Sequence, residues 1–428
     1  MKKLLSMLFV LLLLFSSCSN AGDVIETTEA ADTTTEAETT AEMIETEPLP
    51  DPLTIYEENK TTYQVVYRDD DDSLSSQNAA GLAKKLSSLG FSMIRTKSDL
   101  YKKESPEILI GPTKRPESTE VLESLPENSY AITIKNGSLV IVGTSDTLTA
   151  LALYKFEEMV LSNPERCADG KLMVTAEDIV TVTDETVYTL KEMITLGFGI
   201  SAISKKVGLS SAVGECRVGQ GACSDGSYVY LCMRNSDDTA TVISKHDIQT
   251  GERVMHSEPL DLGHANDATF DTKNNRIVVA HGTSQGRIVS LINPDTLELI
   301  EDINIPVAAG AISYNAKRDC YASSSGGKTL NILSSEFQLL KGFTRTDNAG
   351  YTAQGMGSDD DYLFFPMSGK SDNILVVYNW EGQYVTTIKI PMTEESESLF
   401  WVNGNYYVAY HVGGESFYLT TFVPVYSE

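Results

Sequence analysis

Two stretches of this chain nearly repeat each other: Gln220-Gly-Ala-Cys-Ser-Asp-Gly-Ser-Tyr228 and Gln354-Gly-Met-Gly-Ser-Asp-Asp-Asp-Tyr362. Each places a turn of acidic and small residues before a run of aromatic and β-branched residues, a pattern typical of a strand that follows a tight turn. They are the clearest members of five strand groups, which start 44 to 46 residues apart at Gln220, His264, Gly310, Gln354 and Ser398. A repeat of this length with four short strands in each unit indicates a β-propeller.

The predicted propeller spans residues 186–428, and turn signals mark its units. Asp225-Gly226, Asn274-Asn275, Asp359-Asp360 and Asn403-Gly404 separate first strands from second strands. The fifth group lacks an outer strand, and we expect Val187–Leu190 or a nearby stretch to supply it and close the ring. Five blades are favoured; six or seven stay open, because residues 191–219 could form a degenerate blade. A β-sandwich or an open β meander is the alternative fold.

Two further phrases of this region are distinctive, Gly263-His-Ala-Asn-Asp-Ala-Thr269 and Lys245-His-Asp-Ile-Gln-Thr-Gly251. Together with the Gln-Gly strand starts, they resemble bacterial five-bladed propellers of the teichoic-acid biosynthesis protein C-like type. The resemblance implies a five-bladed ring and a bacterial cell-surface context.

Residues 52–182 show a different order of elements. Glu107–Gly111 is a short apolar strand of the kind buried in a sheet with both faces covered. Asn136-Gly137 between two strand patterns predicts a hairpin, and residues 147–161 predict an amphipathic helix. The sequence thus predicts a small mixed α/β domain. Residues 60–165 resemble the α/β accessory domain that precedes the catalytic domains of several bacterial glycoside hydrolases. This resemblance implies a carbohydrate context and no catalytic residue in the domain.

The N-terminus has the pattern of a secretion signal. Lys2 and Lys3 precede the apolar run 4–15, which is too short to span a bilayer, and Ser16-Ser17-Cys18 resembles a bacterial lipobox. We therefore predict a signal peptide over residues 1–17 and lipidation of Cys18; ordinary cleavage near Ala21 is the alternative. Residues 18–51 then form an acidic, threonine-rich stalk, since they bury too little apolar surface to fold. The protein is expected outside the cytoplasm, anchored to the membrane by lipid.

The charge balance excludes some classes of partner. The 428 residues carry 60 acidic against 33 basic side chains, a formal net charge of −27. A nucleic-acid partner is excluded, because it would require a basic face. Six cysteines are too few for a disulfide scaffold. With Cys18 assigned to lipid, a pairing of Cys223 with Cys232 is possible, but buried free thiols are favoured.

The candidate ligand site lies where the innermost strands of a propeller begin. Side chains that can donate or accept hydrogen bonds gather at this mouth and suit a hydroxyl-rich ligand. The predicted ligand-binding residues are Gln220, His264, Asn266, Gln354 and Ser398. The alternative is that they satisfy strand ends or bind channel water. Trp380, in a predicted turn, could stack on a sugar, whereas Trp401, on an innermost strand, is expected in the core.

Catalysis would need two carboxyl groups at a fixed separation, and Asp267 with Glu397 is the one pair nominated. No Walker loop is present, the histidines lack metal-site spacing, and neither a cofactor nor a metal is predicted. The sequence therefore predicts a cell-surface lipoprotein that binds glycan or cell-wall polymer, or scaffolds a protein partner, without catalysis. The alternative is a carbohydrate-active enzyme of the glycoside hydrolase kind. A solute-capturing lipoprotein fits less well, because such proteins have two α/β lobes.

Overall fold

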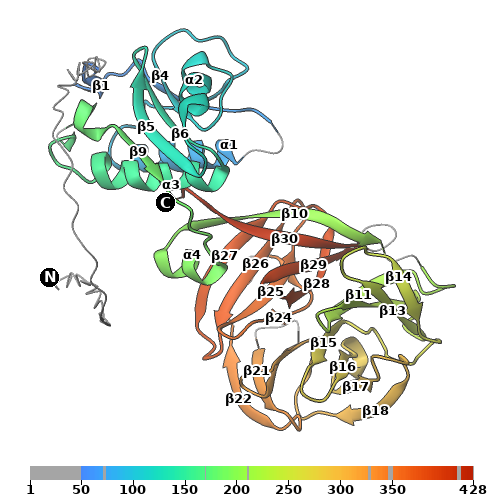
Figure 1. Ribbon diagram of the computed structural model, residues 1–428. Helices are drawn as coiled ribbons and strands as arrows, with labels where there is room; N and C mark the ends of the chain where they lie inside the picture. Colours follow the sequence, from blue (N-terminus) through green and yellow to red (C-terminus); the bar gives the residue numbers. More distant parts are fainter. Residues whose placement is uncertain are drawn as a thin grey trace, which may run out of the picture. The chain divides into compact units, whose positions relative to one another are not determined.

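The computed structural model describes residues 50–70, 74–168, 170–209, 212–325, 329–345, 350–411 and 416–427 (Figure 1). The predicted signal peptide, Cys18 and almost all of the predicted stalk lie outside these ranges. Residues from Leu49 onward form one compact unit. Within the described ranges, no helix has both the length and the apolar character needed to cross a membrane.

The first part of this unit is a six-stranded mixed sheet. Its strand order is β3 (Thr96–Ser98), β2 (Gln64–Tyr67), β4 (Glu107–Ile110), β6 (Ser138–Gly143), β5 (Ser129–Lys135) and β9 (Val180–Thr183). The first four are mutually parallel, while β5 runs antiparallel to both of its neighbours. Asn136 and Gly137 both have positive φ, so the β5–β6 hairpin turns where the sequence predicts it.

Helices cover both faces of this sheet, which explains its nearly continuous apolar strands. The helices are α1 (Ser75–Ser88), α2 (Pro116–Ser124) and α3 (Asp146–Phe156), which continues into η1 (Glu157–Leu161). One hydrophobic cluster joins the sheet to α1 and α3, and a second joins its other face to α2. A small sheet of β1 (Leu53–Tyr56), β8 (Lys171–Val174) and β7 (Cys167–Ala168) lies beside them, followed by η2 (Ala176–Asp178).

The rest of the unit is a β-propeller, as the repeat predicts. Three successive antiparallel sheets have four strands each, in the order in which they follow along the chain. The first is β11 (Val218–Ser224), β12 (Tyr228–Arg234), β13 (Thr241–Asp247) and β14 (Arg253–His256). The second is β15 (Asp267–Asp271), β16 (Arg276–Ala280), β17 (Ile288–Ile292) and β18 (Leu299–Asn304). The third is β19 (Ala311–Asn315), β20 (Cys320–Ser324), β21 (Thr329–Ser334) and β22 (Leu339–Thr344).

Two further groups of strands share one nine-stranded sheet, joined by a single parallel bridge between Ser201 and Lys389. The first group is β23 (Thr352–Ala353), β24 (Gly357–Ser358), β25 (Tyr362–Ser368), β26 (Asn373–Asn379) and β27 (Tyr384–Ile390). The second is β28 (Glu395–Val402), β29 (Asn405–His411), β30 (Ser416–Val425) and β10 (Gly199–Leu209). The last group therefore takes its outer strand from the chain that precedes the propeller.

The prediction that Val187–Leu190 or a nearby stretch supplies this outer strand is wrong for Val187–Leu190 and confirmed for the nearby stretch Gly199–Leu209. Strand β10 pairs with β30 along its whole length, whereas Leu190 begins the helix α4 (Leu190–Leu196). The Thr189 side chain accepts from the backbone N–H of Glu192, and the Glu192 side chain bonds back to Thr189, so the helix starts with a capping box. Gly197, in the left-handed region at φ 73°, ends it. Leu190 and Met193 then anchor α4 to the propeller core.

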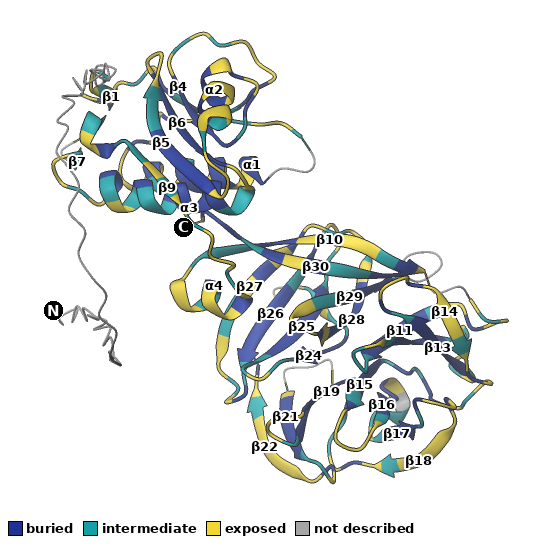
Figure 2. Ribbon diagram, viewed as in Figure 1, coloured by how far each residue is buried: buried dark blue, intermediate teal, exposed yellow. Residues whose placement is uncertain are grey.

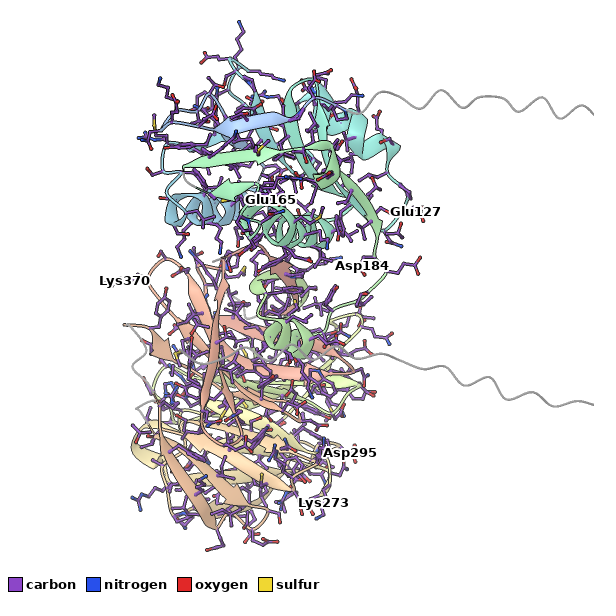
Figure 3. The ribbon with its side chains drawn as sticks, turned by 90° about the vertical axis from the view of Figure 1, so that its left-hand side faces the viewer. Glu127, Glu165, Asp184, Lys273, Asp295 and Lys370 are labelled. Carbon is purple, nitrogen blue, oxygen red and sulfur yellow. The ribbon has the colours of Figure 1, made fainter. Side chains whose placement is uncertain are left out.

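The propeller core lies between the faces of adjacent strand groups. A hydrophobic cluster joins each group to the next, and one joins β28–β30 of the last group to β11 and β12 of the first. The outer strands β14, β18 and β22 are mostly exposed (Figure 2). Charged side chains such as Lys273, Asp295 and Lys370 are exposed (Figure 3).

The glycine of the repeated Gln-Gly pair is required by steric crowding at the propeller axis. A Cβ added to Gly221 would lie 2.5 Å from the backbone carbon of Asp267, and one added to Gly355 would lie 2.4 Å from the Glu397 carbonyl oxygen. Only glycine lets the innermost strands approach this closely. The near-repeat that reveals the fold in the sequence is thus required by the packing of the ring.

Candidate functional site

The structure brings several of the predicted site residues together where the innermost strands begin. Asn266 donates its side-chain amide to the Gly310 carbonyl at 2.6 Å and to the Gln354 carbonyl at 3.1 Å. The Gln354 amide donates to Glu395. Two of these bonds join neighbouring strand groups, and the bond from Asn266 to Gln354 joins the second group to the fourth, so these polar side chains hold the strand groups together.

The other predicted ligand-binding residues also have partners within the chain. The Gln220 amide donates to the Gly219 carbonyl at 2.6 Å, and Gln220 is 8% exposed. His264 Nδ1 lies 2.9 Å from Asp238 Oδ2, in the loop before β13. Ser398 is fully buried. This geometry favours the alternative that these side chains satisfy strand ends, and a role in ligand binding stays a prediction.

Asp267 lies buried at the axis, where it links the strand groups. Its Oδ2 accepts the backbone N–H groups of Ile312 and Met356, each at 2.9 Å. The Ser398 hydroxyl lies 2.6 Å from Oδ1 and 3.0 Å from the Ala222 carbonyl. Burial raises the pKa of the Asp267 carboxyl to about 8.

The hydroxyl proton of Ser398 decides which form of Asp267 fits this arrangement. Ser398 has one proton and two acceptors within reach, and a carbonyl oxygen cannot donate. If Ser398 donates to Ala222, Asp267 must donate to Ser398 and is therefore protonated. A protonated Asp267 that bonds to Ser398 and accepts two backbone N–H groups favours a structural role for this residue. Glu397, its proposed partner in catalysis, is 4% exposed.

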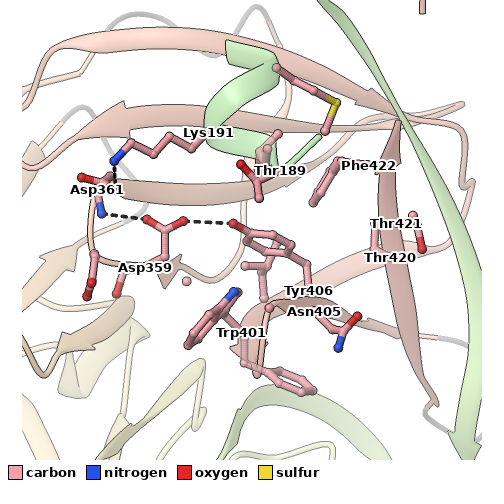
Figure 4. A pocket seen from close by; sticks show the side chains of 18 of the residues that line it. Thr189, Lys191, Asp359, Asp361, Trp401, Asn405, Tyr406, Thr420, Thr421 and Phe422 are labelled. Carbon is pink, nitrogen blue, oxygen red and sulfur yellow. Dashed lines mark hydrogen bonds and ion pairs between the residues drawn. The ribbon is translucent and has the colours of Figure 1, made fainter. Parts of the chain in front are cut away.

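A large cavity opens at the other end of the innermost strands. Its volume is about 1010 Å³, and none of the predicted site residues lines it. Its walls include the ends of the innermost strands, the turns that follow them, the C-terminal part of β30, and the segment from Asp184 to Lys191 and Met193 (Figure 4). The cavity is within the size range of ligand sites.

Trp401 projects into this cavity from the β28–β29 hairpin. It is 46% exposed, while its neighbours Phe400 and Val402 are buried, as expected for alternate residues of a strand. Asn403 and Gly404, with φ of 49° and 85°, form the two-residue turn that pairs Trp401 with Tyr406. The expectation that Trp401 lies in the core is wrong.

Trp380, the tryptophan expected to be accessible, is instead 5% exposed. Its indole N–H donates to the Asp359 carbonyl at 3.1 Å, and the Arg318 guanidinium lies over its ring at 5.6 Å. A buried indole needs such a partner for its N–H. Trp380 therefore supports the wall of the cavity from behind and is not placed to stack on a ligand.

Asp359 holds the turn on the facing side of the cavity. Its Oδ1 accepts the backbone N–H groups of Asp361 and Tyr362 at 2.9 and 2.7 Å, and its Oδ2 accepts the Tyr406 hydroxyl at 2.9 Å. Burial, the largest cause, and the charge of Asp361 raise the pKa of the Asp359 carboxyl above its ordinary value. The turn and the hairpin are thus tied together, and the wall around Trp401 is preorganised.

The fifth strand group differs from the other four in the residue directly before the turn that follows its innermost strand. The residue paired with the start of the second strand is Asp225, Asp271, Asn315 and Asp359 in the first four groups, and Val402, the neighbour of Trp401, in the fifth. Each of the four accepts backbone N–H bonds from its own turn. Aligning the repeats on the residue before each turn would have marked the segment Trp401-Val402 as the exception, and this is the signal that the sequence analysis missed.

One segment matches the sequence pattern of a catalytic motif but not the structure that the motif requires. Gly282-Thr-Ser-Gln-Gly286 fits the Gly-x-Ser-x-Gly pattern, whose serine must sit on a sharp turn from a strand into a helix. Here the segment holds the short η3 (Thr283–Gln285) between the antiparallel strands β16 and β17, so the required context is missing. Among the residues that the structure describes, no group of three His, Cys, Asp or Glu side chains could hold a metal ion. Cys167, Cys216, Cys223, Cys232 and Cys320 are free thiols.

No family model matches the chain, and no curated protein matches it. Similar solved structures include a glutaminyl cyclase of Myxococcus xanthus, at 10% identity and a TM-score of 0.40, over 53% of this chain and 99% of that one. A member of the DUF4221 family from Bacteroides vulgatus has 10% identity and a TM-score of 0.35, with the same coverage. Hydrazine synthase of Kuenenia stuttgartiensis has 12% identity and a TM-score of 0.31, over 46% of this chain and 57% of that one. The assignment of a β-propeller rests on the sheets of this chain.

Proposed function

We propose that this protein is a lipid-anchored cell-surface protein that binds a glycan or cell-wall polymer through a five-bladed β-propeller, without catalysis. The single observation that carries the proposal is the half-exposed indole of Trp401 in a cavity whose mostly apolar lining also holds polar side chains. An indole offers a flat apolar face at little cost in side-chain entropy, and a pyranose ring has an apolar face of matching size.

The groups around Trp401 suit hydroxyl recognition. Asn405 and Thr421 are exposed in the lining and can each donate and accept, while Thr189 lies at the start of α4 (Figure 4). The Tyr406–Asp359 bond and the Asn403-Gly404 turn fix the wall beside them. A site built on strands and tight turns binds without a large cost of ordering.

The test is a glycan array followed by calorimetry with Trp401→Ala. We expect the protein to bind at least one class of surface polysaccharide and the variant to bind it at least about fivefold more weakly, since an aromatic contact of this kind contributes about 1–3 kcal/mol. Tyr384→Ala is the matched control, because Tyr384 is 51% exposed on β27 and lies outside the cavity lining. Equal binding by Trp401→Ala and the parent protein would overturn the assignment of the cavity.

The hydrolase alternative keeps Asp267 and Glu397 as its catalytic pair. It is tested by the release of reducing ends from polysaccharides that the protein binds. The hydrogen bonds of Asp267 and its complete burial favour binding without turnover. Turnover that is lost in Asp267→Asn, with folding intact, would establish the enzyme instead. A protein that binds no polysaccharide would leave the role of a scaffold for a protein partner.

A further inference from the structure

The cavity around Trp401 is unevenly charged. Its lining holds five acidic side chains, Asp184, Glu185, Asp359, Asp360 and Asp361, against the single cation Lys191. Even when Asp359 is left out of the count, four carboxyl groups and one lysine give the lining a formal net charge of −3. A concave wall of one sign concentrates counter-ions of the other sign.

The cations near the wall do not cancel this charge. Lys191 is bound to Asp361, with Nζ 2.8 Å from Oδ2. Lys317, outside the lining, lies 3.5 Å from Asp360, and both of these side chains are mostly exposed. Glu185, which also belongs to the lining, is exposed. A ligand that enters therefore meets carboxylates that only two lysines partly offset.

This arrangement discriminates among glycans by charge. A phosphate- or carboxylate-bearing polymer would bring like charges together, which is unfavourable at short range. An ammonium group would meet carboxylates and could also lie over the face of Trp401, where a cation is attracted to the indole. A neutral acetamido group would gain neither contact. Figure 4 shows Trp401 and Asp359 on the same opening.

We propose that the cavity selects glycans that carry free amino groups over the same glycans in N-acetylated form and over anionic wall polymers. The selection rests on the proposed function, because it assumes that the Trp401 cavity is the glycan site. It assigns the ring face to the indole and the amine to the acidic wall formed by Glu185, Asp360 and Asp361.

The experiment compares three probes by calorimetry at pH 6: glucosamine oligomers, N-acetylglucosamine oligomers of the same length, and a glycerol-phosphate oligomer. We expect the amine form to bind about tenfold more tightly than the acetylated form, as two carboxylates at the surface of a site can supply. Raising the salt concentration should shrink this ratio, because exposed charges are screened. The glycerol-phosphate oligomer should bind most weakly.

Variants connect the preference to the wall. Asp360→Asn and Glu185→Gln should each lower the ratio of the two affinities about two- to threefold, and Lys191→Gln should raise it, since it unpairs Asp361. Asp295→Asn is the control, because Asp295 is exposed on a turn outside the lining. Equal affinity for the amine and acetylated oligomers, or tighter binding of the phosphate polymer, overturns the charge selection and leaves the glycan site standing. Failure of every probe and every arrayed glycan to bind overturns the proposed function itself.

Discussion

The buried carboxyl of Asp267 allows a sharp test of how the propeller axis is held. Two backbone N–H groups converge on its Oδ2, while its Oδ1 faces the Ser398 hydroxyl, which in turn reaches the Ala222 carbonyl. An asparagine in the same rotamer offers one oxygen to the two N–H groups and one amide N–H to Ser398. Asp267→Asn therefore mimics the protonated acid and should cost less than about 1 kcal/mol at pH 5.

Asp267→Ala should be far more damaging, and its cost follows from the contacts. It leaves the N–H groups of Ile312 and Met356 buried without an acceptor, at about 1–3 kcal/mol each, so the free energy of unfolding should fall by about 2–6 kcal/mol. The assay is urea unfolding at pH 5, followed by the fluorescence of Trp380 and Trp401. The two variants differ in hydrogen bonding at one site, so the comparison separates hydrogen-bond loss from loss of charge.

The pH dependence of the free energy of unfolding gives a second test of the protonated state of Asp267. Because the pKa of Asp267 is about 8 in the fold against a usual 3.8, the folded protein holds a proton that the unfolded chain releases. This stabilisation is complete below pH 4 and declines as the pH rises toward 8, by up to about 1.4 kcal/mol per pH unit. The stability of the parent protein relative to Asp267→Asn should therefore fall between pH 5 and pH 7.

Two results would refute this reasoning. If Asp267→Asn destabilised the protein as much as Asp267→Ala at pH 5, the carboxyl of Asp267 would be an ionised acceptor and not a protonated acid that donates to Ser398. If the difference between the parent protein and Asp267→Asn stayed constant from pH 5 to pH 7, the carboxyl would not titrate in this range. In both cases the aspartate would again be available as a charged group for catalysis.

Three further outcomes are expected. Cys18→Ser should release the protein from membranes, as measured by fractionation, and continued membrane association would contradict the lipobox. Gly404→Val should weaken glycan binding and cost about 1–2 kcal/mol in urea unfolding, because φ is 85° there; unchanged binding would show that the turn does not set the position of Trp401. Tyr426→Ala should lower the free energy of unfolding by about 3–5 kcal/mol, because the ring is buried and its hydroxyl donates to Glu157 at 2.6 Å; a loss below 1 kcal/mol would contradict this anchoring.

Much of the propeller can be predicted from the sequence, because the packing of the ring and its tight turns require particular residues. Gly221 and Gly355 are required by the close approach of innermost strands, and Asn403-Gly404 by a turn with positive φ at both positions. The closing strand was harder to predict. Val187 has a strand-like residue pattern around it, yet it is 88% exposed, and the capping box of Thr189 and Glu192 starts a helix directly after it.

The sequence analysis missed the cavity around Trp401 for a related reason. Aligning the repeats drew attention to polar residues at equivalent positions, such as Gln220 and Gln354, and equivalent positions are the ones that build the ring. Their side chains form hydrogen bonds within the chain. A residue that recurs in every unit of a repeat protein serves a role that every unit shares, and the role that all units share is packing. A ligand that binds once on the axis breaks the symmetry and needs residues that do not recur.

Trp401 is such a residue. Four units place a turn-capping acid or amide directly before this turn, whereas the fifth has Val402 there, preceded by the exposed indole of Trp401. Lys191, from a helix that no other unit has, adds a second asymmetric element to the same cavity. Trp401→Asn would remove the indole and leave a polar side chain in its place beside the turn. Because a turn is already formed by Asn403 and Gly404, we expect this variant to keep its stability and to lose glycan binding. That result would distinguish residues needed for the folding of the ring from residues needed for ligand binding.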